Sequence, residues 1–333
     1  MNATKVCKAI TTMTPSTALM PLIRIAQAGI AHPFGDERTV TQAFPSGINE
    51  HDADPFLMCD FFDSVERNGP AAEGEYPVDW HPHRGFDICS YLKSGKGRHA
   101  DSLGNRETYE TPGMQWMSTG SGVYHAEGGA NEKGSRVTGF QIWINVPAHQ
   151  KMMDPKYGTV PPKDLPTIKE EGSVVRVMAG KAFGATGPFE TVQDVEMLDM
   201  ELHRQTEQST SKIGVDIETG LDTAMLYAYK GGPVELSLPN GEKRELASGN
   251  IALLDASSDD VRGIEISADV QSDEPACVML FAGKKLQQPI AWHGPIVMNT
   301  QTEIRQALSE LRTGSFPPKR VDWDYMSAAG KPN

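Results

Sequence analysis

The sequence predicts an all-β protein: two antiparallel β-barrels of the jelly-roll type with a short C-terminal helix. Short strand-like runs recur along most of the 333 residues, helical periodicity is scarce, and one strand-turn-strand pattern occurs twice. A chain of this length exceeds what one small core usually organises, so two domains are expected. Many short strands in each domain favour a barrel or a jelly roll.

Alternating apolar and polar side chains mark the strands. The stretch FQIWINV (140–146) alternates residue by residue, as a strand with one buried face does. Further β-rich runs end near Gly, Asp or Ser: VVRVMAG (174–180), TAMLYAYKGG (223–232), IALLDA (251–256) and CVMLFAG (277–283). Between VELSL and KREL, Asn240-Gly241 is a strong signal for a β-hairpin.

An internal repeat divides the chain. SLGNRETYETPGMQWMS, from Ser102, and SLPNGEKRELASGNIALLD, from Ser237, both have the pattern turn, polar strand, small-residue turn, apolar strand. A duplicated β domain is the economical interpretation. The segment 147–172 holds five prolines and little periodicity, so we expect a linker there. The predicted organisation is an N-terminal arm (1–36), a first barrel (37–146), the linker (147–172), a second barrel (173–298), and a helix with a tail (299–333).

One helix is expected near the C-terminus. Thr300 and Glu303 form a capping-box pattern, in which each side chain satisfies a free backbone amide of the other residue. A narrow apolar stripe follows and Gly314 ends the helix; the stripe comprises Ile304, Ala307, Leu308 and Leu311. We expect the stripe to bury against a barrel wall. The C-terminal half lacks the ligand set, so we expect it to be structural, covering the first barrel or building a partner surface, and to contribute no group to the functional site.

Composition excludes several classes of function. The chain has 31 basic and 44 acidic residues, a net charge of −13 and no Lys/Arg cluster, which argues against direct nucleic-acid binding. No run of about 18 apolar residues exists, so no membrane span is expected. Cys7, Cys59, Cys89 and Cys277 are scattered, as in a protein with reduced thiols. We therefore expect a cytoplasmic protein, or also a nuclear one if its source is eukaryotic.

The first 36 residues contain no acidic residue before Asp36, and Lys5, Lys8 and Arg24 lie among many Ser and Thr residues. This pattern faintly resembles a transit peptide. An arm that packs on the barrel is the simpler interpretation, and it is the one we prefer.

Two short motifs place histidines in strand-like segments. DWHPHRGFDICSYL (79–92) carries His81 and His83, and GVYHAEGG (122–129) carries His125 and Glu127. Residues i and i+2 of a strand face the same way, so each pair shares a face. If both faces point into one barrel, three imidazoles and a carboxylate converge, a set that holds a divalent metal. The second copy of the repeat has no histidine near either corresponding place, as expected of a single functional site.

Three nitrogen donors and one oxygen donor leave positions open on a five- or six-coordinate ion. A closed structural zinc site recruits Cys more often. The set suits one Fe(II) ion, and also Mn, Co, Ni, Cu or Zn. The open positions can bind O2 together with a bidentate organic anion, or simply water.

Several longer stretches resemble the pirin family of the cupin superfamily. They are DPFLMCDFF, HPHRGFD, QWMSTGSGVYHAEGG, QIWIN and PIAWHGPIVMNTQTEIRQA, and the resemblance runs from about residue 37 to about residue 312. It implies a bicupin fold with metal in the N-terminal barrel only. It also implies His81, His83, His125 and Glu127 as the metal ligands.

Asp87 departs from the family pattern. Cupins at large take a carboxylate ligand a few residues after His-x-His, and Asp87 occupies that place on the same strand parity as His83. Pirins commonly have a Glu there that is not a ligand. Two roles are open for Asp87: accepting a hydrogen bond from a ligand imidazole, or contacting the metal itself.

The resemblance implies two classes of function. The first is an enzyme of the quercetin 2,3-dioxygenase type with a small aromatic, flavonol-like substrate, in which the metal is Lewis acid and template and Glu127 accepts the flavonol proton. Phe86, Trp116 and Met117 are candidates to line an apolar mouth, although core packing is the simpler role for each. The second is a redox-sensitive iron protein that binds a protein partner, such as a transcription factor or a metabolic enzyme. A degenerate cupin that binds metal without turnover is the third, blander option.

Overall fold

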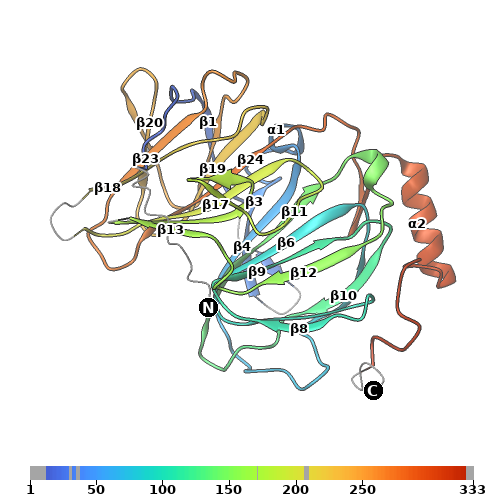
Figure 1. The fold of residues 1–333 in the computed structure, drawn as a ribbon. Helices are drawn as coiled ribbons and strands as arrows, with labels where there is room; N and C mark the ends of the chain where they lie inside the picture. Colours follow the sequence, from blue (N-terminus) through green and yellow to red (C-terminus); the bar gives the residue numbers. More distant parts are fainter. Residues whose placement is uncertain (1–12, 30–31, 35–37, 171, 206–209, 328–333) are drawn as a thin grey trace, which may run out of the picture.

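The computed structural model describes residues 13–29, 32–34, 38–170, 172–205 and 210–327. Two β-barrels lie side by side, one at the lower right and one at the upper left of Figure 1, with a helix at the right-hand edge. Each barrel is built around a seven-stranded and a four-stranded antiparallel sheet. The predicted all-β fold, with two barrels and a short C-terminal helix, is confirmed.

The first barrel is formed by β2 to β12. Its larger sheet has the strand order β12-β9-β6-β11-β4-β3-β2, and its smaller sheet the order β5-β10-β7-β8. The bounds are β2 (His32–Phe34), β3 (Arg38–Phe44), β4 (Phe56–Val65), β5 (Val78–His83), β6 (Phe86–Ser94), β7 (Gly97–Asp101), β8 (Arg106–Tyr109), β9 (Gly113–Ser118), β10 (Val123–Glu127), β11 (Arg136–Asn145) and β12 (Lys156–Val160), with two short helices, α1 (Glu50–Ala53) and η1 (Ala148–Gln150).

The second barrel repeats this arrangement. Its sheets have the orders β1-β22-β19-β24-β17-β14-β13 and β18-β23-β20-β21. The bounds are β1 (Leu22–Gln27), β13 (Thr167–Glu170), β14 (Ser173–Ala179), β15 (Lys181–Ala182), β16 (Ala185–Thr186), β17 (Val195–Leu202), β18 (Thr210–Asp216), β19 (Thr223–Lys230), β20 (Val234–Ser237), β21 (Lys243–Leu246), β22 (Asn250–Leu254), β23 (Gly263–Asp269) and β24 (Ala276–Gly283). The matching strand order confirms the internal repeat, and the predicted hairpin at Asn240-Gly241 joins β20 to β21.

The edge strands come from outside the two repeats. Within the expected linker 147–172, β12 pairs with β9 of the first barrel and β13 pairs with β14 of the second. From the expected arm 1–36, β1 pairs with β22, and Met13 and Met20 enter the core of the second barrel. Residues 1–12 of the arm lie outside the described residues. The predicted division of the chain into the ranges 1–36, 37–146, 147–172, 173–298 and 299–333 stays a prediction.

An apolar layer with a buried ion pair joins the barrels. The two seven-stranded sheets face each other across this layer, in which the Phe61 and Phe140 rings lie 5.1 and 4.8 Å from the ring of Tyr229. Lys93 of β6 lies 3.1 Å from the fully buried Asp199 of β17. Because each charge is desolvated, the pair depends on both partners being present.

Apolar side chains fill the interior of the second barrel. Its four-stranded sheet contributes Ile213, Val215, Ile264 and Ile266, which are buried and lie opposite one another on β18 and β23. Branched aliphatic side chains pack well on a pleated surface. The corresponding strands of the first barrel, β5 and β10, carry the histidine motifs instead, so the two interiors differ in chemistry although their frameworks match.

The C-terminal segment returns to the first barrel. After β24 the chain forms β25 (Ala291–His293), β26 (Ile296–Met298) and α2 (Gln301–Thr313). The predicted capping box of Thr300 and Glu303, and the left-handed Gly314 at the end of the helix, are confirmed. Ile304 and Ala307 of the predicted stripe are buried in one cluster with side chains of the hairpin, and Tyr124 of β10 packs against this cluster. Figure 1 shows α2 at the right-hand edge, on the side of the first barrel. The helix therefore packs against the hairpin and, through Tyr124, against the first barrel.

In the part of the chain that the structure describes, no helix is long and apolar enough to cross a membrane. Cys59, Cys89 and Cys277 are free and buried, and desolvation raises the pKa of each thiol. A thiol with a raised pKa is a poor nucleophile. Cys7 lies outside the described residues.

A buried carboxyl group makes the stability of the second barrel depend on pH. Glu196 of β17 is fully buried, and its Oε2 accepts the backbone N–H of Glu218 at 3.3 Å. Desolvation raises the pKa of Glu196 from the ordinary 4.5 to about 8. Between these values the folded state holds a proton that the unfolded state has released, so stability falls as pH rises through this window.

Replacing Glu196 with Gln should remove this pH dependence, because the amide does not titrate. Relative to the parent protein, the variant should gain stability by up to about 1.4 kcal/mol per pH unit between about pH 5 and 8. Urea unfolding at several pH values measures the difference, with Glu242→Gln at an exposed position as the control. A stability difference that stays constant over this range would contradict the prediction.

Candidate metal centre

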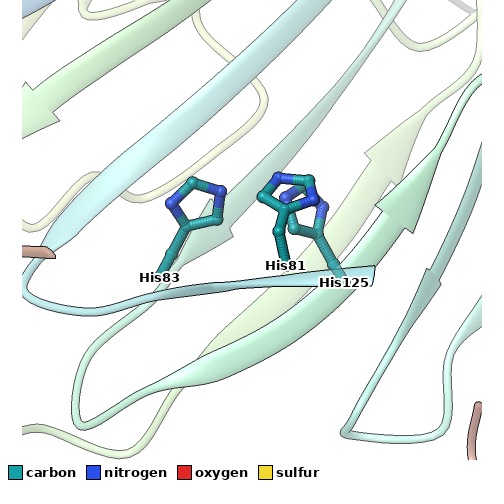
Figure 2. A group of neighbouring side chains, drawn as sticks. All are labelled: His81, His83 and His125. Carbon is teal, nitrogen blue, oxygen red and sulfur yellow. The ribbon is translucent and has the colours of Figure 1, made fainter. Parts of the chain in front are cut away.

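Three histidines meet on the inner face of the four-stranded sheet of the first barrel. His81 and His83 are two residues apart on β5, so both face the interior, and the antiparallel register sets His125 of β10 opposite His81. The ring centroids lie 4.8, 4.3 and 4.9 Å apart, and each ring offers a nitrogen within 4.8 Å of the other two. Figure 2 shows the three side chains extending from their strands toward the same side.

The hydrogen bonds of these rings leave nitrogens available for a ligand. Nδ1 lies 2.7 Å from the Asp79 carbonyl oxygen in His81, and 3.3 Å from the Pro295 carbonyl oxygen in His83. A carbonyl only accepts, so Nδ1 carries the proton in both rings and Nε2 keeps a free lone pair. Nε2 of His83 and both nitrogens of His125 are buried without a hydrogen-bond partner. Metal-bound imidazoles commonly donate their other N–H to a carbonyl in this way, so the three residues fit a divalent metal ion.

Burial keeps two of the rings neutral. Desolvation lowers the pKa of His83 and of His125 well below the ordinary 6.5, and the neighbouring His81 lowers both further. The neutral imidazole is the form that binds a metal. These rings therefore need to release no proton before an ion binds near neutral pH.

Glu127 lies beyond His125 on β10, after a β-bulge in the pairing with β5. Its carboxylate accepts the side-chain N–H groups of Gln115, at 3.3 Å, and of Gln141, at 3.1 Å. Among the described residues, the group whose ligand atoms lie within 4.8 Å of one another comprises the three histidines without Glu127. The assignment of Glu127 as fourth ligand therefore stays a prediction.

Asp87 faces away from the histidines. Its carboxylate accepts the Trp116 Nε1–H at 2.9 Å, and desolvation raises its pKa to about 6. The neighbouring Phe86 and Ile88 belong to the interior cluster of the first barrel, whereas Trp116 belongs to the layer between the barrels. The structure supports neither of the two roles left open for Asp87 at the metal site.

The apolar side chains around the site include some of the lining residues that the sequence predicted. Of the three predicted lining residues, Phe86 and Met117 face the barrel interior, and Trp116 does not. Sequence reasoning missed Trp143, whose ring lies 5.2 Å from that of His83 and 4.4 Å from that of Phe86. The alternation in FQIWINV places Trp143 on the opposite face from its apolar neighbours, and that signal could have identified it.

A buried histidine beside the site was also missed. His99 of β7 has Nε2 at 3.0 Å from the Asp101 carboxylate, and its ring stacks on Tyr157 at 4.1 Å. The same ring lies 5.5 Å from that of His125. The i, i+2 spacing in RHAD is the same kind of signal as His-x-His, but the sequence does not show that β7 pairs with β10.

The C-terminal half of the chain does reach the site. Pro295 lies in the turn between β25 and β26, and it supplies the carbonyl oxygen beside His83 Nδ1 across 212 residues of sequence. The expectation that this half contributes no group to the site is therefore wrong. The hairpin makes this contact because it folds back over the first barrel.

Comparisons with known proteins place the chain in a family. Its residues 37–144 match the Pirin family model, and residues 198–317 match the model of the Pirin C-terminal cupin domain. A putative quercetin 2,3-dioxygenase of Pseudomonas aeruginosa is 34% identical, over 78% of this chain and 86% of that protein. The chain belongs to the pirin family.

Other members of the pirin family support the fold. Pirin of Homo sapiens is 31% identical over 78% of this chain and 81% of that protein. The structure of a quercetin 2,3-dioxygenase from Acinetobacter baumannii has a TM-score of 0.76 and 29% identity, over 90% of this chain and 99% of that one. A bacterial pirin from Escherichia coli, in complex with nickel(II), shares the fold at a TM-score of 0.53 and 20% identity, over 79% and 99% of the two chains. The bicupin fold is confirmed, and this pirin-family chain carries a candidate three-histidine site for a divalent metal.

Separate changes of Glu127 and Asp87 should distinguish their roles in this pirin-family site. Glu127→Ala should weaken divalent-metal affinity by about 10-fold or more, because it removes the predicted fourth ligand. Asp87→Asn should leave the affinity nearly unchanged, because that side chain faces Trp116. Competition between the protein and a chelator for Co(II) measures both variants. Equal, severe losses would instead favour Asp87 as a ligand.

Proposed function

We propose that this pirin-family protein is a metal-dependent dioxygenase of the quercetin 2,3-dioxygenase type, with a small aromatic, flavonol-like substrate. The observation that carries the proposal is the group of three imidazoles, two of them fully buried and neutral, with nitrogens free for a ligand. The second barrel has aliphatic side chains on the corresponding strands. Relatives named putative quercetin 2,3-dioxygenases support the reaction type. The cytoplasm is the proposed compartment.

One divalent first-row metal would be held by His81, His83 and His125, with Glu127 completing the set. We assign Fe(II), and nitrogen-rich sets also accept Mn, Co, Ni, Cu or Zn. The bound metal supplies Lewis-acid polarisation and a template for substrate and O2. The three imidazoles come from two paired strands, so the fold fixes their spacing before any ion arrives.

The protein side chains supply orientation and proton transfer. Glu127 is the proposed acceptor of the substrate hydroxyl proton, and the amides of Gln115 and Gln141 orient its carboxylate. A base must lie within hydrogen-bond reach of the proton that it accepts. The rings of Phe86 and Trp143 form an apolar wall beside His83 and keep water away from it.

A small cavity adjoins Glu127 inside the first barrel. Its volume is about 70 Å³, and Phe62, Phe140 and Arg98 are among its walls. A cavity of about 150 Å³ holds benzene, so this cavity alone does not hold a three-ring flavonol, and the three histidines are not among its lining residues. Arg98 holds the neighbouring segment 66–77 through the carbonyl oxygens of residues 71, 72 and 75.

The acidic charge balance of the chain favours a second candidate function. In this alternative, the protein is a redox-sensitive iron protein that regulates a protein partner, such as a transcription factor or a metabolic enzyme. A relative named pirin, without an enzyme name, is compatible with it. The net charge of −13 suits a protein partner better than a nucleic acid.

Protein produced in minimal medium should carry about one equivalent of a first-row metal per chain, mostly iron. One equivalent is expected because the second barrel has an apolar interior and no histidine group among its described residues. Elemental analysis of the purified chain measures the content. Two equivalents per chain, or none after reconstitution, would contradict the proposed site.

Iron-loaded protein mixed anaerobically with quercetin and then exposed to O2 should show ring opening of the flavonol by absorbance. His83→Ala should abolish the change, because it removes one nitrogen ligand. Asp87→Asn is the matched control, because it alters a buried residue on the other face of the barrel wall. A protein that binds iron without turnover, but captures a partner in one iron oxidation state only, would favour the regulatory candidate.

A further inference from the structure

We propose that the C-terminal turn Gly294-Pro295 positions the metal ligand His83 through the backbone carbonyl of Pro295. Pro295 is thus a positioning residue: it acts on the metal only through the imidazole. The consequence for metal affinity rests on the proposed metal function. The effect of Pro295 on the His83 ring does not rest on the proposed metal function, because the contact is present in the metal-free protein.

The turn presents its carbonyl in a defined direction. β25 and β26 pair from Ala291↔Met298 to His293↔Ile296, so Gly294 and Pro295 form a two-residue turn. Gly294 has a φ of 54°, which suits the first central residue of such a turn. The carbonyl oxygen of Gly294 also accepts the Trp292 Nε1–H at 2.8 Å. The direction of the following carbonyl is therefore set by the hairpin itself.

The same hairpin holds the chain that follows His83. The Arg84 carbonyl oxygen accepts the Val297 N–H at 3.0 Å, next to a parallel bridge between Arg84 and Ile296. Lys151, which is buried, donates to the carbonyl oxygens of Gly85, at 2.6 Å, and of Val297, at 3.2 Å. One direct hydrogen bond and a bridge through Lys151 therefore join the segment after His83 to the hairpin, beside the His83–Pro295 contact.

The helix α2 adds a charged contact to this joint. The buried Arg84 side chain donates Nε–H to the Ser121 carbonyl oxygen at 2.8 Å and forms an ion pair with Glu310 of α2. Its guanidinium carbon lies 4.8 Å from the centre of the Phe316 ring. A guanidinium with several fixed partners moves little. The helix α2 and Phe316 therefore both contact the residue that directly follows His83.

A fixed carbonyl at Nδ1 selects one tautomer of His83. With the proton on Nδ1, the lone pair is on Nε2, which is buried and has no hydrogen-bond partner. Without the carbonyl, both tautomers become accessible and the ring is free to turn. Such outer partners of metal-bound histidines typically contribute about 10- to 100-fold to metal affinity.

The direct test changes the backbone conformation of the turn by a substitution whose added Cβ contacts no neighbouring atom. Gly294→Val places a branched side chain at a positive φ, which strains the backbone next to Pro295, and no atom lies within 4 Å of the added Cβ. Gly241→Val is the matched control, because Gly241 also has a positive φ, of 81°, and no atom within 4 Å of an added Cβ. Gly241 lies in the hairpin of the second barrel.

A second pair of variants covers the case in which Gly294→Val does not fold. Glu310→Gln removes the charge that pairs with Arg84 and leaves the backbone of the turn intact. Glu265→Gln is its control, because the Glu265 side chain is 20% exposed, close to the 23% of Glu310, and pairs with Lys212 in the second barrel. Because Glu310→Gln weakens the contact between α2 and Arg84, it should change the His83 tautomer and the Co(II) affinity in the same direction as Gly294→Val, but by a smaller amount.

Two readouts decide the proposal. In metal-free protein, nitrogen NMR of His83 should show the Nδ1–H tautomer in the parent and a tautomer mixture in Gly294→Val. Chelator competition should show about 10- to 100-fold weaker Co(II) binding for Gly294→Val, with an altered visible spectrum of bound Co(II) and no change for Gly241→Val. An unchanged tautomer in both test variants would overturn the proposal. A parent with the Nδ1–H tautomer that binds no Co(II) would uphold the positioning and overturn the proposed metal function.

Discussion

The register between β5 and β10 is the constraint on which the candidate site depends. His125 lies opposite His81, and His83 is two residues farther along the same face. A slip of one residue would turn every inward side chain of β10 to the other face. The β-bulge before Glu127 is a local change within this register, and it directs that carboxylate to two glutamine amides. The spacing of the imidazoles is thus a property of sheet pairing and does not depend on a loop.

The second barrel shows what the same framework does without a site. Its inward positions on β18 and β23 are aliphatic, and burial of these side chains stabilises the barrel at no polar cost. Some polar groups inside the first barrel are paired: Glu127 accepts the Gln141 amide, and Nε2 of His99 lies 3.0 Å from the Asp101 carboxylate, although Nδ1 of His99 is buried without a partner. Nitrogens of His83 and His125 are not paired, and each such buried group costs about 1–3 kcal/mol. Because these costs fall at one point between three rings, a ligand bound there would offset them together.

Local patterns in the sequence predicted much of this structure. The histidine motifs, the hairpin at Asn240-Gly241 and the capping box depend on residues a few positions apart, so their spacing carries the information. The parity count for Asp87 failed because β5 ends at His83 and β6 begins at Phe86 in a different sheet. The edge strands β1 and β12 lie in segments whose patterns are too weak to show a strand, and their pairing is decided by the free edges of sheets formed elsewhere in the chain.

The contact between Pro295 and His83 belongs to a further level that no local pattern reveals. It exists because the chain, after completing the second barrel, returns across the first and packs β25, β26 and α2 there. Arg84 illustrates the result: it follows directly after a predicted ligand, yet its charge is balanced by Glu310 near the end of the chain. A buried guanidinium without that partner would be costly, so the ligand strand and the C-terminal helix stabilise each other. A division into a functional first barrel and a structural C-terminal half therefore does not describe this chain. The second barrel has an apolar interior, but the segment that leaves it completes the surroundings of the histidines.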